Sequence, residues 1–279
     1  MLMRATTFKP LHAARPVIWW LMVVYAMVAT MVLIGGITRL TGSGLSMVTW
    51  EPVMGLLPPT SDEAWRALFA QYQASPQFQQ INHWMTLPDF KQIFFWEYVH
   101  RVFGRLIGLV FFFPWLVFTL RGMLRGRLAL RAFVAFVLGG LQGLLGWYMV
   151  KSGLVDIPAV SHYRLAAHLS LAFFIGGYVL WLLLDLRDRQ PRRPNTSLAS
   201  MGRWFLGLTC LQIVFGAFMA GTRAGYLYQT FPDMNGVMVP QNWLDLSPIW
   251  VNFVENHRIV DGGSHFKRLT NCNFCHCSA

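Results

Sequence analysis

The chain has 279 residues, of which 55% are hydrophobic and 13% are charged, and its mean hydropathy is +0.43. A soluble domain usually carries about 25% charged residues, so this composition excludes a water-soluble globule, and its apolar content excludes a disordered chain. The formal net charge of +11 would suggest nucleic acid as a partner in a soluble protein. In an integral membrane protein the location of the charges matters more than their sum, because Lys and Arg collect in cytoplasmic loops.

Five segments are apolar over enough residues to cross about 30 Å of hydrocarbon, which takes about 20 helical residues each. The first has a longer apolar run than a signal peptide and ends in Gly-Gly-Ile-Thr-Arg, so we expect it to be retained. The fold class predicted is an all-α integral membrane protein in the lipid bilayer, with a first four-helix bundle and the start of a second half-bundle. The five predicted helices are Pro16–Gly36, Ile93–Leu120, Ala132–Val150, Arg164–Leu184 and Trp204–Gly221.

The charges alternate along the chain between these helices. Residues 1–15, 121–131 and 185–203 carry net charges of +3, +4 and +3, whereas residues 38–91 carry −1 and residues 151–162 and 222–279 carry zero. This pattern predicts a cytoplasmic N-terminus, with the near-neutral segments and the C-terminal tail on the other side. Nearly all of the +11 is therefore a topology signal, and we expect no nucleic-acid partner.

The loop over residues 38–91 is too long for a plain connector. Ser61 followed by two acidic residues predicts a helix start, and Trp65, Leu68, Phe69 and Tyr72 follow at helical spacing. The interpretation we favour is an amphipathic helix on the outer membrane surface, and the alternative is a core helix of a small subdomain. A capping box at residues 86–89 predicts that the second membrane helix begins outside the hydrocarbon.

Ionisable side chains cluster inside two of the predicted membrane helices, where each costs about 2.5–3.5 kcal/mol to insert. Glu97, His100 and Arg101 share one face of the second helix, and Arg164 and His168 share one face of the fourth. Two His at similar depth suit a haem with two axial imidazoles, and the flanking Arg101 and Arg164 suit its propionates. The alternatives are histidines that hydrogen-bond between helices, and a zinc site, which would need a third ligand.

Five stretches carry a further signal and cover the chain from about residue 16 to about residue 256. They are GGITRLTGSGLSMVTWEPVMGLLPPT (35–60), LPDFKQIFFWEYVHRVFGRLIGLV (87–110), LQGLLGWYMVKSGL (141–154), DIPAVSHYRLAAHLS (156–170) and GAFMAGTRAGYLYQTFPDMNG (216–236). These stretches resemble the heme A synthase family of alpha-proteobacteria and mitochondria. The family oxidises the C8 methyl group of haem O to the formyl group of haem A, which terminal oxidases use. The resemblance implies eight helices in two similar halves, each with a His pair, in the bacterial inner membrane with a periplasmic C-terminal tail.

The resemblance also implies roles for single residues. His100 and His168 correspond to the axial pair around the substrate haem O, and Glu97 corresponds to a functionally important acid that we expect to be catalytic, moving protons or stabilising a charged intermediate. A haem b cofactor belongs to the second half. The expected partners are haem O, an electron donor, haem O synthase and oxidase-assembly proteins. The alternative function is a bis-His membrane protein that binds haem or passes electrons without oxidation chemistry.

We expect the family pattern to end near residue 256 and the chain to be truncated there, without the second His pair and its haem b site. Loss of the second half would argue against present activity. The expected organisation is a first four-helix half over residues 1–186, the start of the second half over 187–256, and a non-family, disordered tail over 257–279. The tail holds Cys272-Asn-Phe-Cys275-His276, which fits the spacing of covalent haem attachment. A zinc site is a further alternative, and an unstructured tail is the interpretation that we favour.

Overall fold

The computed structural model describes residues 15–49, 57–153, 160–187 and 196–222, with a few positions between 230 and 249. It divides into two compact units. The first contains Met1–Ala159 and Leu171–Arg193, and the second contains Val160–Ser170 and Pro194–Ala279.

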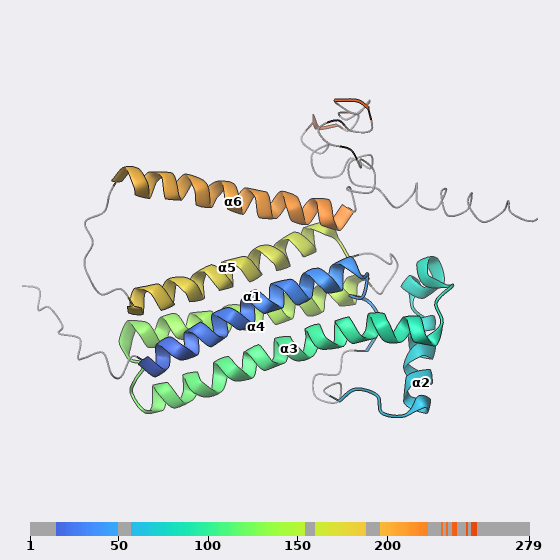
Figure 1. The fold of residues 1–279 in the computed structure, drawn as a ribbon, viewed down its shortest axis with the longest axis horizontal. Helices are drawn as coiled ribbons and strands as arrows, with labels where there is room; N and C mark the ends of the chain where they lie inside the picture. The colour runs from blue at the N-terminus through green and yellow to red at the C-terminus, as the bar shows by residue number, and fades with distance from the viewer. Residues whose placement is uncertain are drawn as a thin grey trace, which may run out of the picture. The chain divides into compact units, whose positions relative to one another are not determined.

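The described residues form helices and no β-strand. Five of these helices are long and apolar enough to cross a membrane, which confirms the five predicted spans, and each extends beyond the predicted limits at one end or at both. The elements are α1 (Arg15–Leu40), α2 (Asp62–Gln73), the π-helix η2 (Phe78–Asn82), α3 (Leu87–Leu120), α4 (Gly126–Gly153), α5 (His162–Arg187) and α6 (Thr196–Thr222) (Figure 1).

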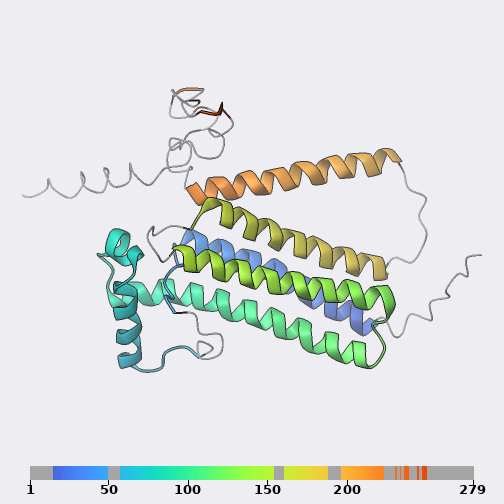
Figure 2. The same ribbon diagram turned by 180° about the vertical axis from the view of Figure 1, so that it is seen from behind.

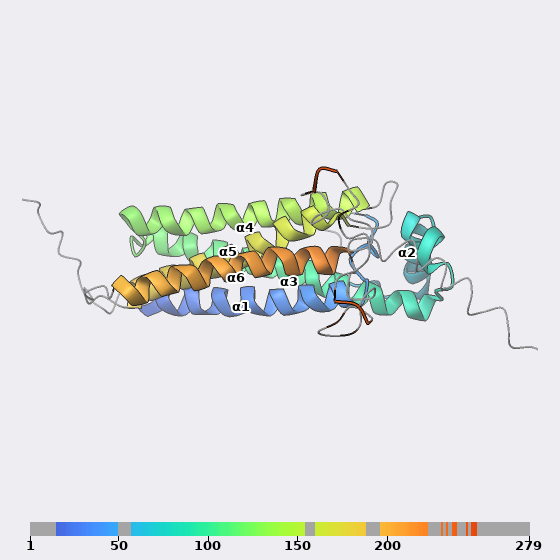
Figure 3. The same ribbon diagram turned by 90° about the horizontal axis from the view of Figure 1, so that it is seen from above.

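The main core of the first unit lies between α1, α3, α4 and the part of α5 that follows Leu171 (Figures 2 and 3). Trp20 on α1 lies at its centre, where its ring packs against Phe111 and Phe118 of α3. Its indole N–H donates to the carbonyl of Val110 at 3.0 Å. This packing of four helices around one apolar core is the first four-helix bundle predicted from the sequence.

A second apolar cluster lies at the N-terminal end of α3, where α2 and η2 cover it (Figure 1). Ser61 caps α2, its side chain accepting a hydrogen bond from Ala64 N at 3.2 Å, and the capping box of Thr86 and Asp89 begins α3, as predicted. Tyr72 of α2 stacks on Phe90 of α3 and is fully buried. The apolar face of α2 is therefore covered by protein, so the core-helix alternative fits these contacts better than a helix lying on the membrane surface.

In the second unit, the first turn of α5 packs against the end of α6. His162 contacts the ring of Phe218, and a Cβ at Gly221 would overlap with His162, so the two backbones approach closely there. The rest of α6 presents large apolar side chains on its surface, among them Trp204 and Phe205. Such a surface is suited to lipid or to further helices.

Candidate functional site

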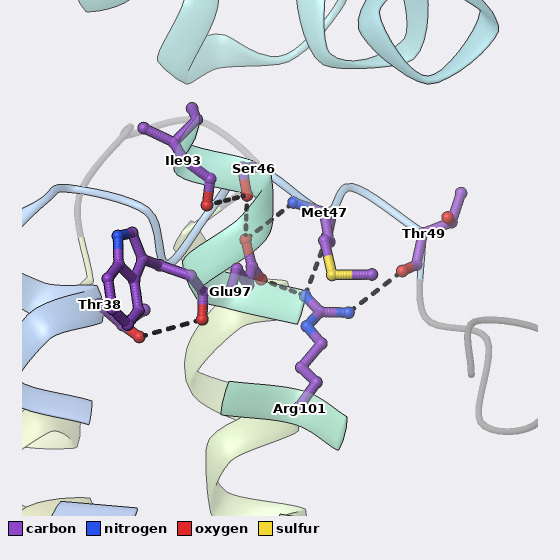
Figure 4. Close-up of polar contacts among 8 residues, drawn as sticks. Thr38, Ser46, Met47, Thr49, Ile93, Glu97 and Arg101 are labelled. Atoms are coloured by element: carbon purple, nitrogen blue, oxygen red, sulfur yellow. Dashed lines mark hydrogen bonds and ion pairs between the residues drawn. The ribbon is translucent and has the colours of Figure 1, made fainter. Parts of the chain in front are cut away.

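The polar residues near the middle of α3 divide into two adjacent stripes, although the sequence placed them on one face. Glu97 and Arg101 point toward the segment of residues 43–49 that follows α1 (Figure 4). His100 and Gly104 face α1 itself, where they meet Gly35 and Met31. The stripes therefore have different neighbours and different chemistry.

The Glu97 carboxylate is 2% exposed and accepts three hydrogen bonds. Its Oε2 accepts from the hydroxyl of Ser46 at 2.7 Å and from the backbone N–H of Met47 at 2.8 Å. Its Oε1 accepts from Arg101 Nη2 at 2.5 Å, in an ion pair whose side chains are 3% and 8% exposed. A buried carboxylate is tolerated when it is both paired and hydrogen-bonded, as here.

The Arg101 guanidinium also binds the backbone of the segment that follows α1. Its Nη2 donates to the carbonyl of Met47 at 2.9 Å, and its Nη1 donates to the carbonyl of Thr49 at 3.3 Å (Figure 4). Arg101 was predicted as a partner of haem propionates. In the structure Arg101 contacts Glu97 and these two carbonyls.

His100 lies three residues after Glu97 and directs its Nε2 toward α1. A methyl group at Gly35 would lie 3.4 Å from that nitrogen, so glycine keeps the space beside the imidazole free of a side chain. Thr38, one turn further along α1, donates to the carbonyl of Ile34 in its own helix at 2.9 Å, and its hydroxyl also lies 3.4 Å from the carbonyl of Trp96, so α1 and α3 are in contact beside the imidazole. The His100 imidazole therefore lies in contact with α1 at Gly35.

A cavity of about 320 Å³ opens between α2, α3 and the segment of residues 46–49. Arg101 and Arg105 line it, together with Tyr98 and Phe94, whereas His100 is not among its lining residues. The cavity therefore lies on the Glu97 side of α3, away from the imidazole.

Arg164 and His168 lie one turn apart on α5, and both are half-buried. They belong to the second unit, whereas Glu97, His100 and Arg101 belong to the first. Among the described residues, no three His, Cys, Asp or Glu side chains gather as a possible metal site. A haem needs no such cluster, because its porphyrin supplies the equatorial ligands.

Two residues in this region carry contacts that were not predicted from the sequence. Ser46 is buried against Glu97, and Gly35 faces His100. The signals that could have identified these two residues were the Gly-Gly pair inside an apolar helix and the Ser directly after a turn. The Cys272–His276 motif of the tail lies outside the described residues.

The sequence is similar to known proteins over most of its length. A family model described as cytochrome oxidase assembly protein matches residues 18–277, past the point near residue 256 where the family pattern was expected to end. The chain is 48% identical to a heme A synthase of Parvibaculum lavamentivorans over 87% of this chain and 70% of that protein. It is 50% identical to a heme A synthase of Paramagnetospirillum magneticum over 82% of this chain and 67% of that protein.

The chain belongs to the heme A synthase family of cytochrome oxidase assembly proteins. A more distant bacterial member, from Wolbachia pipientis wMel, is 43% identical over 88% of this chain and 71% of that protein. No solved structure matches the chain. Membership of a membrane family in haem A biosynthesis fits the five spans, implies that haem is involved, and favours enzyme ancestry over a haem carrier without oxidation chemistry.

Proposed function

We propose that this chain acts as a heme A synthase, which oxidises the C8 methyl group of haem O to the formyl group of haem A. The observation that carries the proposal is the 48% identity to a protein named heme A synthase over 242 residues, which is 87% of this chain. The setting of the residues agrees with the proposal. A His and a buried carboxylate inside a membrane helix are both costly to insert, so their presence there indicates a function.

We propose His100 and His168 as the axial ligands of the haem O substrate. His100 lies twenty residues before the end of α3 at Leu120, and His168 lies nineteen residues before the end of α5 at Arg187. At about 1.5 Å per residue, each imidazole is roughly 30 Å from the end of its own helix. Counted along its own helix, each imidazole is therefore placed as we propose for an axial ligand of the haem.

We propose Arg164 as a partner of the haem propionates, since it lies one turn from His168 and on the same face. Arg101 is a weaker candidate for that role because of its contacts with Glu97 and the backbone. Haem b, when bound in this family, supplies one-electron redox chemistry. Outside the first unit the described histidines are His162 and His168, and we assign neither of them to haem b.

The proposed orientation places the N-terminus in the cytoplasm and the loop bearing α2 in the periplasm of a bacterial inner membrane. It rests on the alternation of basic and near-neutral segments. A membrane-impermeant maleimide should label Gln73→Cys but not Arg127→Cys in intact cells, in a background with the natural cysteines replaced by serine. An electron donor, haem O synthase and oxidase-assembly proteins are the proposed partners.

Expression in a bacterium that makes haem O but lacks its own heme A synthase tests the function. Chromatography of extracted haems should show haem A with the unaltered chain and none with His100→Ala or His168→Ala. His83→Ala is the matched control, since His83 is exposed at the end of η2, and it should retain haem A formation. Bound haem O without any haem A would contradict the proposal and favour a haem-binding protein.

A further inference from the structure

We infer that Ser46, Glu97 and Arg101 form a clamp that positions the end of α1 beside His100, so that Glu97 is a positioning residue for haem binding and not a proton carrier. The inference rests on the proposed function for the identity of the ligand. It assigns a role to Ser46, and it changes the role expected for Glu97.

The clamp joins two pieces of backbone that are far apart in the sequence, residues 46–49 and the turn of α3 that carries Glu97 and Arg101. Glu97 accepts hydrogen bonds from Ser46 and from the N–H of Met47, about fifty residues earlier in the chain (Figure 4). Arg101, one turn later on α3, pairs with Glu97 and binds the carbonyls of Met47 and Thr49. Ser46 is 2% exposed and Glu97 is also 2% exposed, so the hydrogen bond between them is buried.

The donors around Glu97 argue against proton transfer as its function. Three protein donors bind its two oxygen atoms, and all of them come from residues that hold the same segment. Protonation of the carboxylate would weaken both the ion pair and the hydrogen bonds from Ser46 and Met47. A group that must repeatedly gain and lose a proton would release the segment each time.

The clamp acts on the haem ligand through α1. The clamped segment, residues 46–49, begins six residues after the end of α1 at Leu40, and α1 carries Gly35, which faces Nε2 of His100. By holding this segment on α3, the contacts of Glu97 and Arg101 keep the end of α1 in place against the His100 imidazole and so set the orientation of that imidazole for haem binding.

The experiment compares Ser46→Ala, Glu97→Gln and the double variant in the full-length chain purified in detergent. Haem O affinity is measured by titration of the Soret absorbance, and KM and kcat are measured from haem A formation. Ser46→Ala should raise KM and weaken haem O binding about tenfold with a smaller change in kcat, because one hydrogen bond to a charged group is lost. Glu97→Gln should weaken haem O binding at least as much, because it also removes the charge that pairs with Arg101. The double variant should bind haem O no more weakly than Glu97→Gln alone, because the Ser46 hydroxyl acts through Glu97.

Thr30→Ala is the matched control, because Thr30 is a hydroxyl residue of α1 bonded to the carbonyl of Ala26 in its own helix. It should bind haem O as the unaltered chain does. Ser46→Ala removes one hydroxyl and leaves the ion pair in place, so it keeps the test valid if Glu97→Gln fails to fold. The inference is overturned if Ser46→Ala binds haem O normally, or if Glu97→Gln lowers kcat with KM and the Soret spectrum unchanged. Absence of haem A from the unaltered chain would refute the proposed function, while the haem O titration would still test the clamp.

Discussion

The N-terminal half of α3 and its C-terminal half are stabilised in different ways. Up to Arg101, α3 is covered by α2 and by the segment after α1, through an aromatic cluster and a buried carboxylate. From Gly104 onward it packs against helices, with apolar side chains in the contacts. Irregular backbone needs polar partners that hydrocarbon does not supply, so the clamped segment is confined to one end of the span. His100 lies at the junction, where the polar network meets the helix bundle.

Arg101→Met should produce the largest loss of stability. It removes the guanidinium from a buried ion pair and leaves the Glu97 carboxylate with the Ser46 and Met47 donors. Removing one partner of a buried pair costs about 3–5 kcal/mol. Thermal unfolding in detergent would measure the loss, and Arg131→Met, in an ion pair with Asp185 whose partners are 36% and 51% exposed, is the matched control with a small effect. Equal losses in the two variants would contradict a special role for burial.

Tyr72→Phe should weaken the N-terminal half and leave the bundle intact. The hydroxyl of Tyr72 donates to Gln77 Oε1 at 3.1 Å and accepts from Asn82 Nδ2 at 2.8 Å, and both partners lose a bond in the variant. The expected cost is about 1–3 kcal/mol. Hydrogen exchange should increase in α2 and η2 and stay unchanged in α4.

Tyr72 also predicts a dependence on pH. Its burial raises the pKa of its hydroxyl above the usual value near 10, although the hydrogen bond from Asn82 opposes the shift and the charge of Glu97 adds to it. Because the folded-state pKa exceeds the unfolded one, the stabilisation is complete below about pH 10 and is lost as pH rises through the folded-state value. At alkaline pH, α2 should lose less protection from hydrogen exchange in Tyr72→Phe than in the unaltered chain. If both proteins lose this protection over the same pH range, ionisation of Tyr72 is ruled out as the cause.

Gly35→Val should act at the junction between the two halves. A methyl group at residue 35 would already touch Nε2 of His100, and the branches of valine would displace the imidazole. We expect haem O affinity to fall about tenfold, or about 1.4 kcal/mol. Gly36→Val is the control, since a Cβ there meets nothing within 4 Å. Soret titration of both variants checks the prediction, which fails if they bind equally.

Ser61→Ala should have the smallest effect. Ser61 caps α2 by accepting from Ala64 N, and loss of an N-cap costs about 1 kcal/mol. Faster exchange of the first-turn amides of α2, with haem A formation unchanged, is the expected result. A large loss of haem A formation would show that α2 affects the haem site more directly than these contacts indicate.

Local signals explain why much of the fold could be predicted. The five spans follow from apolar runs, and the starts of α2 and α3 follow from Ser61 and from the Thr86–Asp89 capping box. His100 and Glu97 could be singled out because ionisable residues inside a span are costly. The predicted helices were too short, because the polar ends of the helices continue past the hydrophobic stretch.

The partners of those residues could not be predicted in the same way. Helical spacing put Glu97, His100 and Arg101 on one face. Successive residues differ by about 100° around the helix axis, so His100 and Arg101 point toward different neighbours. Spacing alone does not say which neighbours those are. The apolar stripe of α2 was compatible with lipid or protein, and only its contacts with Phe90 and Phe94 decide between them.

The sequence by itself determined the class of this protein, its five membrane helices and the presence of charged residues within them, because hydrophobic length and helix caps are local properties. The tertiary structure decided that Glu97 and Arg101 hold the segment after α1 while His100 faces Gly35. Those contacts join residues about fifty or more positions apart, and the geometry of such contacts depends on how the helices pack.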